Sequence, residues 1–142
     1  MDCPVIAIGS DHAGFDLKAQ VLNLPGFMWD DCGTYGRQSV DYPDYAHKVA
    51  QAVLSGKAQF GILICKTGIG MSMAANRHKG IRAALCINAT MANYARQHND
   101  ANILILGAQF VSFEEAQKCI DTFLTTGFEG GRHAQRVEKI EV

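Results

Sequence analysis

The sequence has 142 residues, of which 48% are hydrophobic and 19% are charged, and its formal net charge at pH 7 is −1. These values are typical of one globular domain with a full hydrophobic core, so we expect a single domain over residues 1–142. The near-zero charge argues against a broad nucleic-acid interface, because a phosphate backbone needs clustered cations. No apolar run approaches the roughly 20 residues that span a bilayer, so we expect no membrane association.

Short apolar runs alternate with helical patterns along the chain. Predicted strands cover Val5–Ile8, Phe27–Trp29 or Phe27–Cys32, Gly61–Ile64, Arg82–Cys86 and Ile103–Leu106. Apolar residues at helical spacing predict helices around Leu17–Leu24, Ala46–Leu54, Ile69–Arg77, Met91–Gln97 and Ala116–Leu124. Ser112 and Glu115 form a capping box before the last of these helices. The segment after Gly131 predicts a terminal helix that leaves the core.

This alternation predicts an α/β fold. Continuously apolar strands are typical of a parallel sheet that helices cover on both faces. We therefore expect a three-layer, Rossmann-like domain with a five-stranded parallel sheet and a C-terminal helix. In such folds ligands bind beyond the carboxyl ends of the strands, so the residues that follow each strand are the first candidates for a site.

The cysteines and the N-terminus indicate the compartment. The five cysteines are scattered and include no Cys-x-x-Cys pair, and the histidines show no zinc-like spacing. The first residues lack the basic and apolar regions of a signal peptide. We therefore expect free thiols, no metal site and a cytoplasmic location.

The clearest candidate site follows the third predicted strand, in the segment Cys65–Gly70 (CKTGIG). Its glycines allow a tight turn that brings backbone N–H groups close to an anion, and the next helix aims its N-terminus at the same place. Positive potential there favours a thiolate at Cys65, which can attack an electrophile or remove a proton beside a carbonyl. Considered alone, the loop is explained equally well by a structural cysteine at a tight turn.

Further polar residues lie at other expected sheet ends and helix ends. Asp11 and His12 follow the first strand, where a helix cap and a surface histidine are the simpler explanation. His98 is expected near a helix C-terminus, where a cation suits the helix dipole. Arg132 and Arg136 share a helical face and could clamp a phosphate, although a solvated terminal helix accounts for them too. The joint occurrence of these groups with a thiol favours a functional site.

These segments resemble the ribose-5-phosphate isomerase B family and its galactose-6-phosphate and allose-6-phosphate isomerase relatives. The resemblance covers nearly the whole chain. It rests on GSDHAG at 9–14, DYP at 41–43, GILIC at 61–65 with TGIG at 67–70, AN at 75–76, GIRA at 80–83, RQHNDAN at 96–102 and EGGRH at 129–133 with Arg136.

The resemblance implies reversible aldose–ketose isomerisation of a small phosphorylated sugar, without metal or organic cofactor. It also implies a homodimer, or a dimer of dimers, in which two subunits build each active site. In this reading Cys65 is the base that moves a proton between C1 and C2, and the partner's His98 opens the sugar ring.

The same resemblance implies the substrate contacts. Backbone N–H groups of the segment after Cys65 stabilise the enediolate oxygen, and Thr67 assists. Asn99 lies beside His98 in ring opening. Asp11 and Tyr42 bind sugar hydroxyls or help in ring opening. The segment that supplies the N–H groups consists of Lys66, Thr67, Gly68, Ile69 and Gly70, and the residues that hold the phosphate are His12, Arg132 and Arg136.

Two positions depart from the family pattern. The family usually has glycine or another small residue at the position of Lys66, whose side chain either points to solvent or adds a cation near the substrate. The family commonly has a phosphate-binding arginine at the position of Gln109, and a glutamine cannot replace a bidentate ionic contact. We therefore expect weaker binding of ribose 5-phosphate, a different phosphosugar, or a sugar without phosphate.

Three alternatives to ribose 5-phosphate isomerisation stay open. The first is the same chemistry on a tetrose, another pentose, allose 6-phosphate or galactose 6-phosphate. The second is a cysteine hydrolase or transferase that uses Cys65 as nucleophile with His98 or His12. The third is a non-catalytic phosphosugar-binding protein, but the joint presence of Cys65, His98 and Asp11 argues against it, because binding alone requires no base.

Overall fold

The computed structural model describes residues 3–142 and contains one sheet of five parallel strands. The strands are β1 (Val5–Ser10), β2 (Met28–Asp31), β3 (Phe60–Cys65), β4 (Ala83–Leu85) and β5 (Ile103–Gly107). They lie in the order β2-β1-β3-β5-β4, and every neighbouring pair is parallel. The predicted fold class is confirmed, and the predicted strands differ from the observed ones by one or two residues at their ends.

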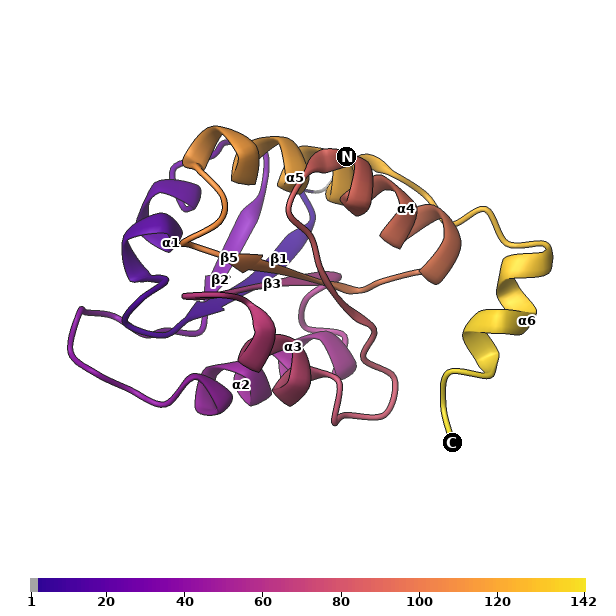
Figure 1. Cartoon of the computed structure of the whole chain (residues 1–142), viewed down its shortest axis with the longest axis horizontal. Coiled ribbons are helices and arrows are strands. Elements are labelled where there is room, and N and C mark those ends of the chain that lie inside the picture. The colour runs from indigo at the N-terminus through magenta and orange to yellow at the C-terminus, as the bar shows by residue number, and fades with distance from the viewer. Residues whose placement is uncertain (1–2) are drawn as a thin grey trace.

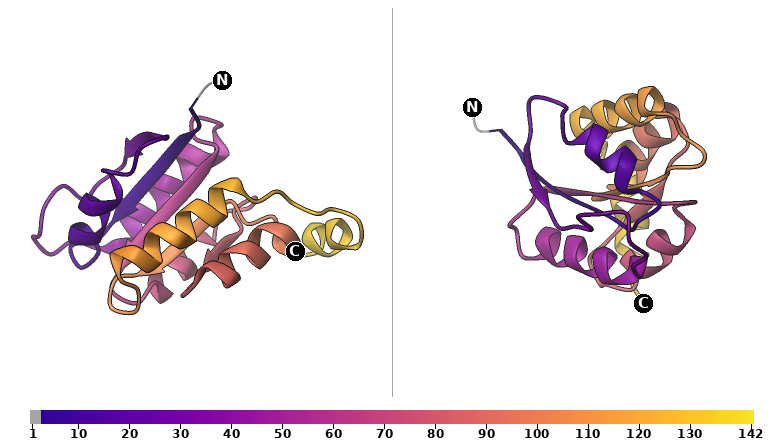
Figure 2. Two further views of the ribbon diagram at one scale, coloured as in Figure 1. Left: turned by 90° about the horizontal axis from the view of Figure 1, so that it is seen from above. Right: turned by 90° about the vertical axis from the view of Figure 1, so that its left-hand side faces the viewer.

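Within the described residues, helices cover both faces of this sheet. They are α1 (Phe15–Val21), α2 (Tyr42–Leu54), α3 (Ile69–Ala75), α4 (Ala89–Asn99), α5 (Phe113–Thr125) and α6 (Arg132–Glu138). Helices α1, α4 and α5 pack on one face, and α2 and α3 pack on the other (Figure 1). The right-hand view of Figure 2 shows the sheet between these two layers. Figure 1 shows that α6 extends beyond them, next to α4.

The core lies on both sides of the sheet because each strand turns alternate side chains to opposite faces. On one face, Ile64 and Leu106 pack with Phe123 of α5. On the other, Leu63 and Ile105 belong to the cluster that includes residues of α2 and α3. Burying each such side chain contributes about 1.5–3 kcal/mol. This two-sided burial explains why the strands are continuously apolar in the sequence.

Two helix starts follow from capping side chains. The Ser112 hydroxyl accepts a hydrogen bond from the Glu115 N–H (3.1 Å), at the predicted start of α5. The Asn88 side chain accepts one from the Met91 N–H (2.9 Å), so α4 begins two residues before its predicted start. Each bond satisfies one of the N–H groups that a helix leaves unpaired at its first turn.

The direction in which the chain adds strands reverses between β1 and β3, which creates the crevice of this fold class. After β1 the chain places β2 on one side, whereas β3, β5 and β4 lie on the other side. Asp11 directly follows β1, and Cys65 is the last residue of β3. The topology therefore brings the residues after β1 and β3 to the same edge of the sheet. Among residues 3–142, no helix is long and apolar enough to cross a membrane.

Candidate active site

A cavity of about 400 Å³ opens at the carboxyl end of β3. Its lining comes from the ends of β1 and β3, the start of α2 and the first turns of α3. The lining residues are Asp11, Tyr42, Cys65, Lys66, Thr67, Ile69, Gly70 and Met73. All of these except Met73 are predicted site residues, so the fold brings together the part of the site that the sequence places around Cys65.

The turn after Cys65 aims a backbone donor at its sulfur. Gly68 has a φ of 82°, a left-handed conformation that favours glycine, and its N–H donates to Cys65 Sγ (3.2 Å). A Cβ atom at Gly68 would lie 2.5 Å from Leu85 Cδ1, so a larger residue there would also require the Leu85 side chain to move. Because the Gly68 N–H points at the Cys65 sulfur, it can also stabilise negative charge on a substrate atom that binds next to this sulfur.

The Cys65 turn is held by main-chain hydrogen bonds to the neighbouring strand. The Ala108 N–H donates to the Cys65 carbonyl (2.9 Å), and the Gln109 N–H donates to the Lys66 carbonyl (3.0 Å). Thr67 Oγ1 accepts from the Ile69 N–H (3.2 Å) at the start of α3. The side chains of Lys66 and Gln109 are exposed, and the hydrogen bond between these two residues joins backbone groups. Their side chains therefore do not hold the turn.

The walls of this cavity come from Tyr42 and Asp11. The Tyr42 ring lies directly against Gly70, where a Cβ atom would overlap with the ring. Asp11 Oδ1 accepts hydrogen bonds from the N–H groups of Ala13 and Gly14 (3.0 Å each). Asp11 thus caps the turn before α1 rather than the helix itself, whose N-cap is Gly14.

His12 and Gly68 are predicted site residues outside the lining of this cavity. His12 is half-buried, and its Nδ1 accepts a hydrogen bond from the Val40 N–H (3.2 Å). His12 therefore ties the end of β1 to the segment between β2 and α2. Gly68 is buried in the turn, and its N–H contacts Cys65 Sγ, which lines the cavity.

The other predicted residues gather at a second cavity of about 390 Å³ between α4 and α6. Its lining consists of His98, Asn99, His133, Arg136, Val137 and Ile140. Arg132 is exposed at the first position of α6, outside this lining. Within one chain, the predicted residues that line a cavity therefore form two separate groups, one around Cys65 and one around His98.

A pair of stacked histidines forms the wall of the second cavity. The His98 and His133 rings are 4.2 Å apart and nearly parallel, at 9°. Glu129 lies across both, with Oε1 3.8 Å from His98 Nε2 and Oε2 4.0 Å from His133 Nε2. Burial of the ring, together with His98 and Arg132, lowers the pKa of His133, which favours its neutral form.

These three side chains are the group that could hold a metal ion in the described part of the chain. Their ligand atoms lie within 4.8 Å of one another. A tetrahedral ion needs nitrogen lone pairs that converge on one point at about 2 Å. Parallel stacked rings direct these lone pairs side by side instead, so the His98–His133 geometry suits mutual packing better than metal coordination.

Sequence reasoning missed two polar contacts that shape the surroundings of the site. Lys18 is fully buried, and its Nζ donates to the Asp31 carboxylate (2.5 Å) and the Thr34 carbonyl (2.6 Å), which anchors the segment after β2. Its position on the apolar face of α1, three residues before Val21, is a signal that could have revealed it. His47 Nδ1 and His78 Nε2 are 2.7 Å apart, and no local pattern predicts this pair.

Comparison with known proteins assigns the chain to a family. A family model described as Ribose/Galactose Isomerase matches residues 6–140. Ribose-5-phosphate isomerase B of Escherichia coli (strain K12) is 47% identical over 138 residues, which are 95% of this chain and 93% of the relative.

Solved structures agree with this assignment. A ribose 5-phosphate isomerase from Thermotoga maritima matches with a TM-score of 0.97 and 55% identity over 99% of both chains. A type B ribose 5-phosphate isomerase from Trypanosoma brucei matches with a TM-score of 0.94 and 44% identity, over 99% of this chain and 98% of that chain. The chain therefore belongs to the ribose/galactose isomerase family and is an aldose–ketose isomerase.

Proposed function

We propose that the chain interconverts ribose 5-phosphate and ribulose 5-phosphate, with Cys65 as the base. The observation that carries this proposal is the position of the sulfur at the cavity. Cys65 is only 5% exposed, lines the cavity with Asp11 and Tyr42, and accepts the Gly68 N–H at 3.2 Å. The relatives from Escherichia coli and Thermotoga maritima are both named as ribose 5-phosphate isomerases, which supports this choice of substrate.

The proposed proton transfer needs one base and one group that stabilises an oxyanion. The Cys65 thiolate takes the proton from C2 of the open-chain aldose, and the electrons of that C–H bond move toward the C1 carbonyl to form an enediolate. The same thiol then returns a proton to C1, and the hydroxyl proton of O2 moves to O1. The C2 oxygen thereby becomes the ketone oxygen and O1 becomes a hydroxyl. Backbone N–H groups of the Cys65 turn stabilise the charge that develops on oxygen, and Thr67 assists.

We assign ring opening to the His98 group, and phosphate binding to Arg136 of that group together with Arg132 and His12, which line neither cavity. His98 transfers the proton that opens the furanose ring, with Asn99 beside it, and Arg132, Arg136 and His12 bind the phosphate. The separation of the Cys65 and His98 cavities within one chain supports a site shared between subunits. In the proposed homodimer, the partner's His98 completes the cavity around Cys65.

Exposed apolar side chains near both cavities support this homodimer. Ile69 and Met73 of α3 are 50% and 59% exposed, and Met91 and Tyr94 of α4 are 42% and 52% exposed. Exposed apolar surface of this kind is typical of protein–protein interfaces. We propose that a second copy of the chain covers it, either in a dimer or in a dimer of dimers. Light scattering together with sedimentation distinguishes these assemblies from a monomer.

The main alternative changes the sugar and keeps the chemistry. Gln109 adjoins the Cys65 turn through its bond to the Lys66 carbonyl, so a missing cation at this position bears directly on substrate binding. A tetrose phosphate, allose 6-phosphate, galactose 6-phosphate or a sugar without phosphate would then be the better substrate. Ratios of kcat/KM over this panel rank the candidates.

The deciding experiment follows ribose 5-phosphate by NMR in D2O with the wild-type protein. We expect ribulose 5-phosphate that carries deuterium at C1, and we expect Cys65→Ala to produce none. Cys3→Ala is the matched control, because Cys3 is an exposed free thiol away from the cavity, and it should behave as wild type. A Cys65→Ala protein with wild-type turnover would exclude Cys65 as the base, and product without deuterium would argue against an exchanging enediolate.

A further inference from the structure

The last turn of α4, which carries His98 and Asn99, ends on a residue in an uncommon conformation. Asp100 caps α4 with a φ of 48°, in the left-handed region that few residues other than glycine adopt. Its carboxylate is held from two sides: Oδ1 accepts from Arg96 Nη1 (2.8 Å), and Oδ2 accepts from Arg82 Nη2 (3.4 Å). Its main-chain carbonyl also accepts from Arg82 Nε (2.8 Å). Two arginines therefore fix the residue that follows Asn99.

Arg96 links this end of α4 to the path that leads to α6. It is 7% exposed, and besides Asp100 it donates to the carbonyls of Ala101 (2.7 Å) and Thr126 (3.0 Å). Thr126 caps the C-terminus of α5, directly before the segment that enters α6. The guanidinium also lies 5.0 Å from the centre of the Phe60 ring. Arg96 thus positions both neighbours of the His98 cavity, α4 and the chain before α6.

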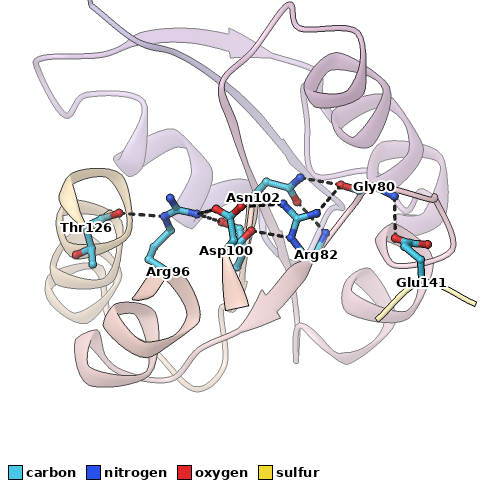
Figure 3. Close-up of polar contacts among 8 residues, drawn as sticks. Gly80, Arg82, Arg96, Asp100, Asn102, Thr126 and Glu141 are labelled. Atoms are coloured by element: carbon cyan, nitrogen blue, oxygen red, sulfur yellow. Dashed lines mark hydrogen bonds and ion pairs between the residues drawn. The ribbon is translucent and has the colours of Figure 1, made fainter. Parts of the chain in front are cut away.

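A second arm of the same network reaches the residues after α6 (Figure 3). Asn102 Oδ1 accepts from the Arg82 N–H, and Asn102 Nδ2 donates to the Gly80 carbonyl (2.8 Å each). The Gly80 N–H in turn donates to Glu141 Oε1 (3.0 Å). One continuous set of hydrogen bonds therefore joins the end of α4, the end of α5 and the C-terminal residues. The end of α4 and Ile140, next to Glu141, line the His98 cavity.

We propose that Arg96 and Asp100 are positioning residues that hold His98 and Asn99 for ring opening. This inference rests on the proposed function, in which His98 opens the sugar ring. Helix ends fray, and a catalytic group must be held within a fraction of an ångström of its working position. The arginine–aspartate network supplies that restraint at the last turn of α4. Within residues 3–142, the network makes no hydrogen bond to the Cys65 turn, whose groups transfer the proton, so its loss affects ring opening and spares proton transfer.

The chemistry of the two sugars allows these steps to be measured separately. Ribose 5-phosphate closes to a furanose ring and must be opened before isomerisation. Ribulose 5-phosphate cannot form the corresponding ring, because its O5 carries the phosphate. Exchange of the C1 proton of ribulose 5-phosphate with D2O therefore reports on Cys65 alone, whereas turnover of ribose 5-phosphate reports on both steps.

The test uses the full-length protein and the variant Asp100→Asn. Asparagine matches aspartate in size and adopts a positive φ readily, so the change removes the charge and keeps the cap. We expect kcat/KM for ribose 5-phosphate to fall at least about tenfold, because small displacements of a catalytic group are costly. We expect C1 exchange of ribulose 5-phosphate to stay within about twofold of wild type. His98→Asn should likewise lower kcat/KM for ribose 5-phosphate and leave C1 exchange near the wild-type rate, and it serves as the reference variant.

Two further variants make the result decisive. Arg96→Lys keeps the positive charge but loses the guanidinium donors that bind Asp100, Ala101 and Thr126. It should therefore lower turnover of ribose 5-phosphate and spare C1 exchange, even if Asp100→Asn folds poorly. Asp16→Asn is the matched control, because Asp16 pairs with Arg37 at the exposed surface (2.8 Å), and both readouts should stay within about twofold of wild type. Circular dichroism confirms that each variant is folded at the assay temperature.

The outcomes separate the positioning role from the function on which it depends. An equal loss of both activities in folded Asp100→Asn and Arg96→Lys, or no loss of either, overturns the positioning role while the isomerase function stands. A wild-type protein that neither turns over ribose 5-phosphate nor exchanges the C1 proton of ribulose 5-phosphate overturns both.

Discussion

The two cavities differ in what holds their functional groups in place. The Cys65 cavity is built by main-chain features: a strand end, a glycine turn and backbone hydrogen bonds to the residues after β5. The His98 cavity is built by side chains: a histidine stack and an arginine–aspartate network at the ends of α4 and α6. We therefore expect the first cavity to fail when backbone geometry changes, and the second to respond to charge and pH.

The largest effect on the backbone-built cavity should come from Gly68→Ala. Gly68 combines a φ of 82° with a Cβ position 2.5 Å from Leu85 Cδ1, whereas Gly56 has a φ of 81° and no atom within 4 Å. Gly56→Ala should therefore lower the free energy of unfolding by about 1 kcal/mol through backbone strain alone. Gly68→Ala should lower it by about 2–3 kcal/mol, because the Leu85 side chain must also move. Urea denaturation of both variants measures the difference. Equal losses would show that the turn at Gly68 is free to move.

The largest stability effect at the side-chain-built cavity should come from Asp100→Ala. Removing the carboxylate leaves the buried Arg96 guanidinium without its ionic partner, while Asp100 itself is 36% exposed in its side chain. We expect the free energy of unfolding to fall by about 2 kcal/mol. This is less than for a fully buried ion pair, because solvent screens the exposed partner. Asp16→Ala at the exposed Arg37 pair should cost less than about 1 kcal/mol. Comparable losses in the two variants would contradict a structural role for the network.

A smaller effect should follow from restoring a cation beside the Cys65 turn. Gln109→Arg should lower KM for ribose 5-phosphate by about fivefold, since a bidentate contact with phosphate is worth more than a glutamine hydrogen bond. Initial rates at several substrate concentrations give KM and kcat separately. An unchanged or higher KM would mean that residue 109 does not face the phosphate in this protein.

The smallest effect concerns pH and belongs to the His98 cavity. Burial, followed by His98 and Arg132, lowers the pKa of His133 in the folded chain below its ordinary value of about 6.5. Between the ordinary and the lowered pKa, the unfolded chain therefore binds more protons than the folded chain. The stability contributed by neutral His133 is therefore present above about pH 6.5 and is lost as pH falls from there toward the lowered value. We expect Tm to fall less steeply between about pH 7 and pH 5 in His133→Asn than in wild type. Parallel curves for the two proteins would rule out this contribution.

The sequence predicts most of the fold because its signals are local. Apolar runs such as those of β3 and β5, and the capping Ser112, identify elements without knowledge of the rest of the chain. The glycines after Cys65 likewise predict a turn at the strand end, where the structure has a cavity. The catalytic and binding roles that the family resemblance implies for these residues stay predictions.

The parts that sequence reasoning missed depend on contacts between distant segments. Arginine and lysine are usually surface residues, yet Arg96 and Lys18 are buried. Carbonyl and carboxylate groups from other elements accept hydrogen bonds from both side chains. The stacking of His98 on His133 likewise requires α6 to return beside α4. The sequence gives partial signals, since Lys18 lies on the apolar face of α1 and Arg96 precedes Asp100 by four residues. The partners from other elements follow from tertiary packing.

The backbone bonds that hold the Cys65 turn have a consequence for how this enzyme family can change. The Cys65 and Lys66 carbonyls are paired with the N–H groups of residues 108 and 109, which any amino acid except proline can supply. Mutations that alter the side chains at 66 and 109 therefore leave the sulfur where it is. Such mutations can accumulate without loss of the chemical step, and substrate preference is then free to drift during evolution while the reaction itself is kept.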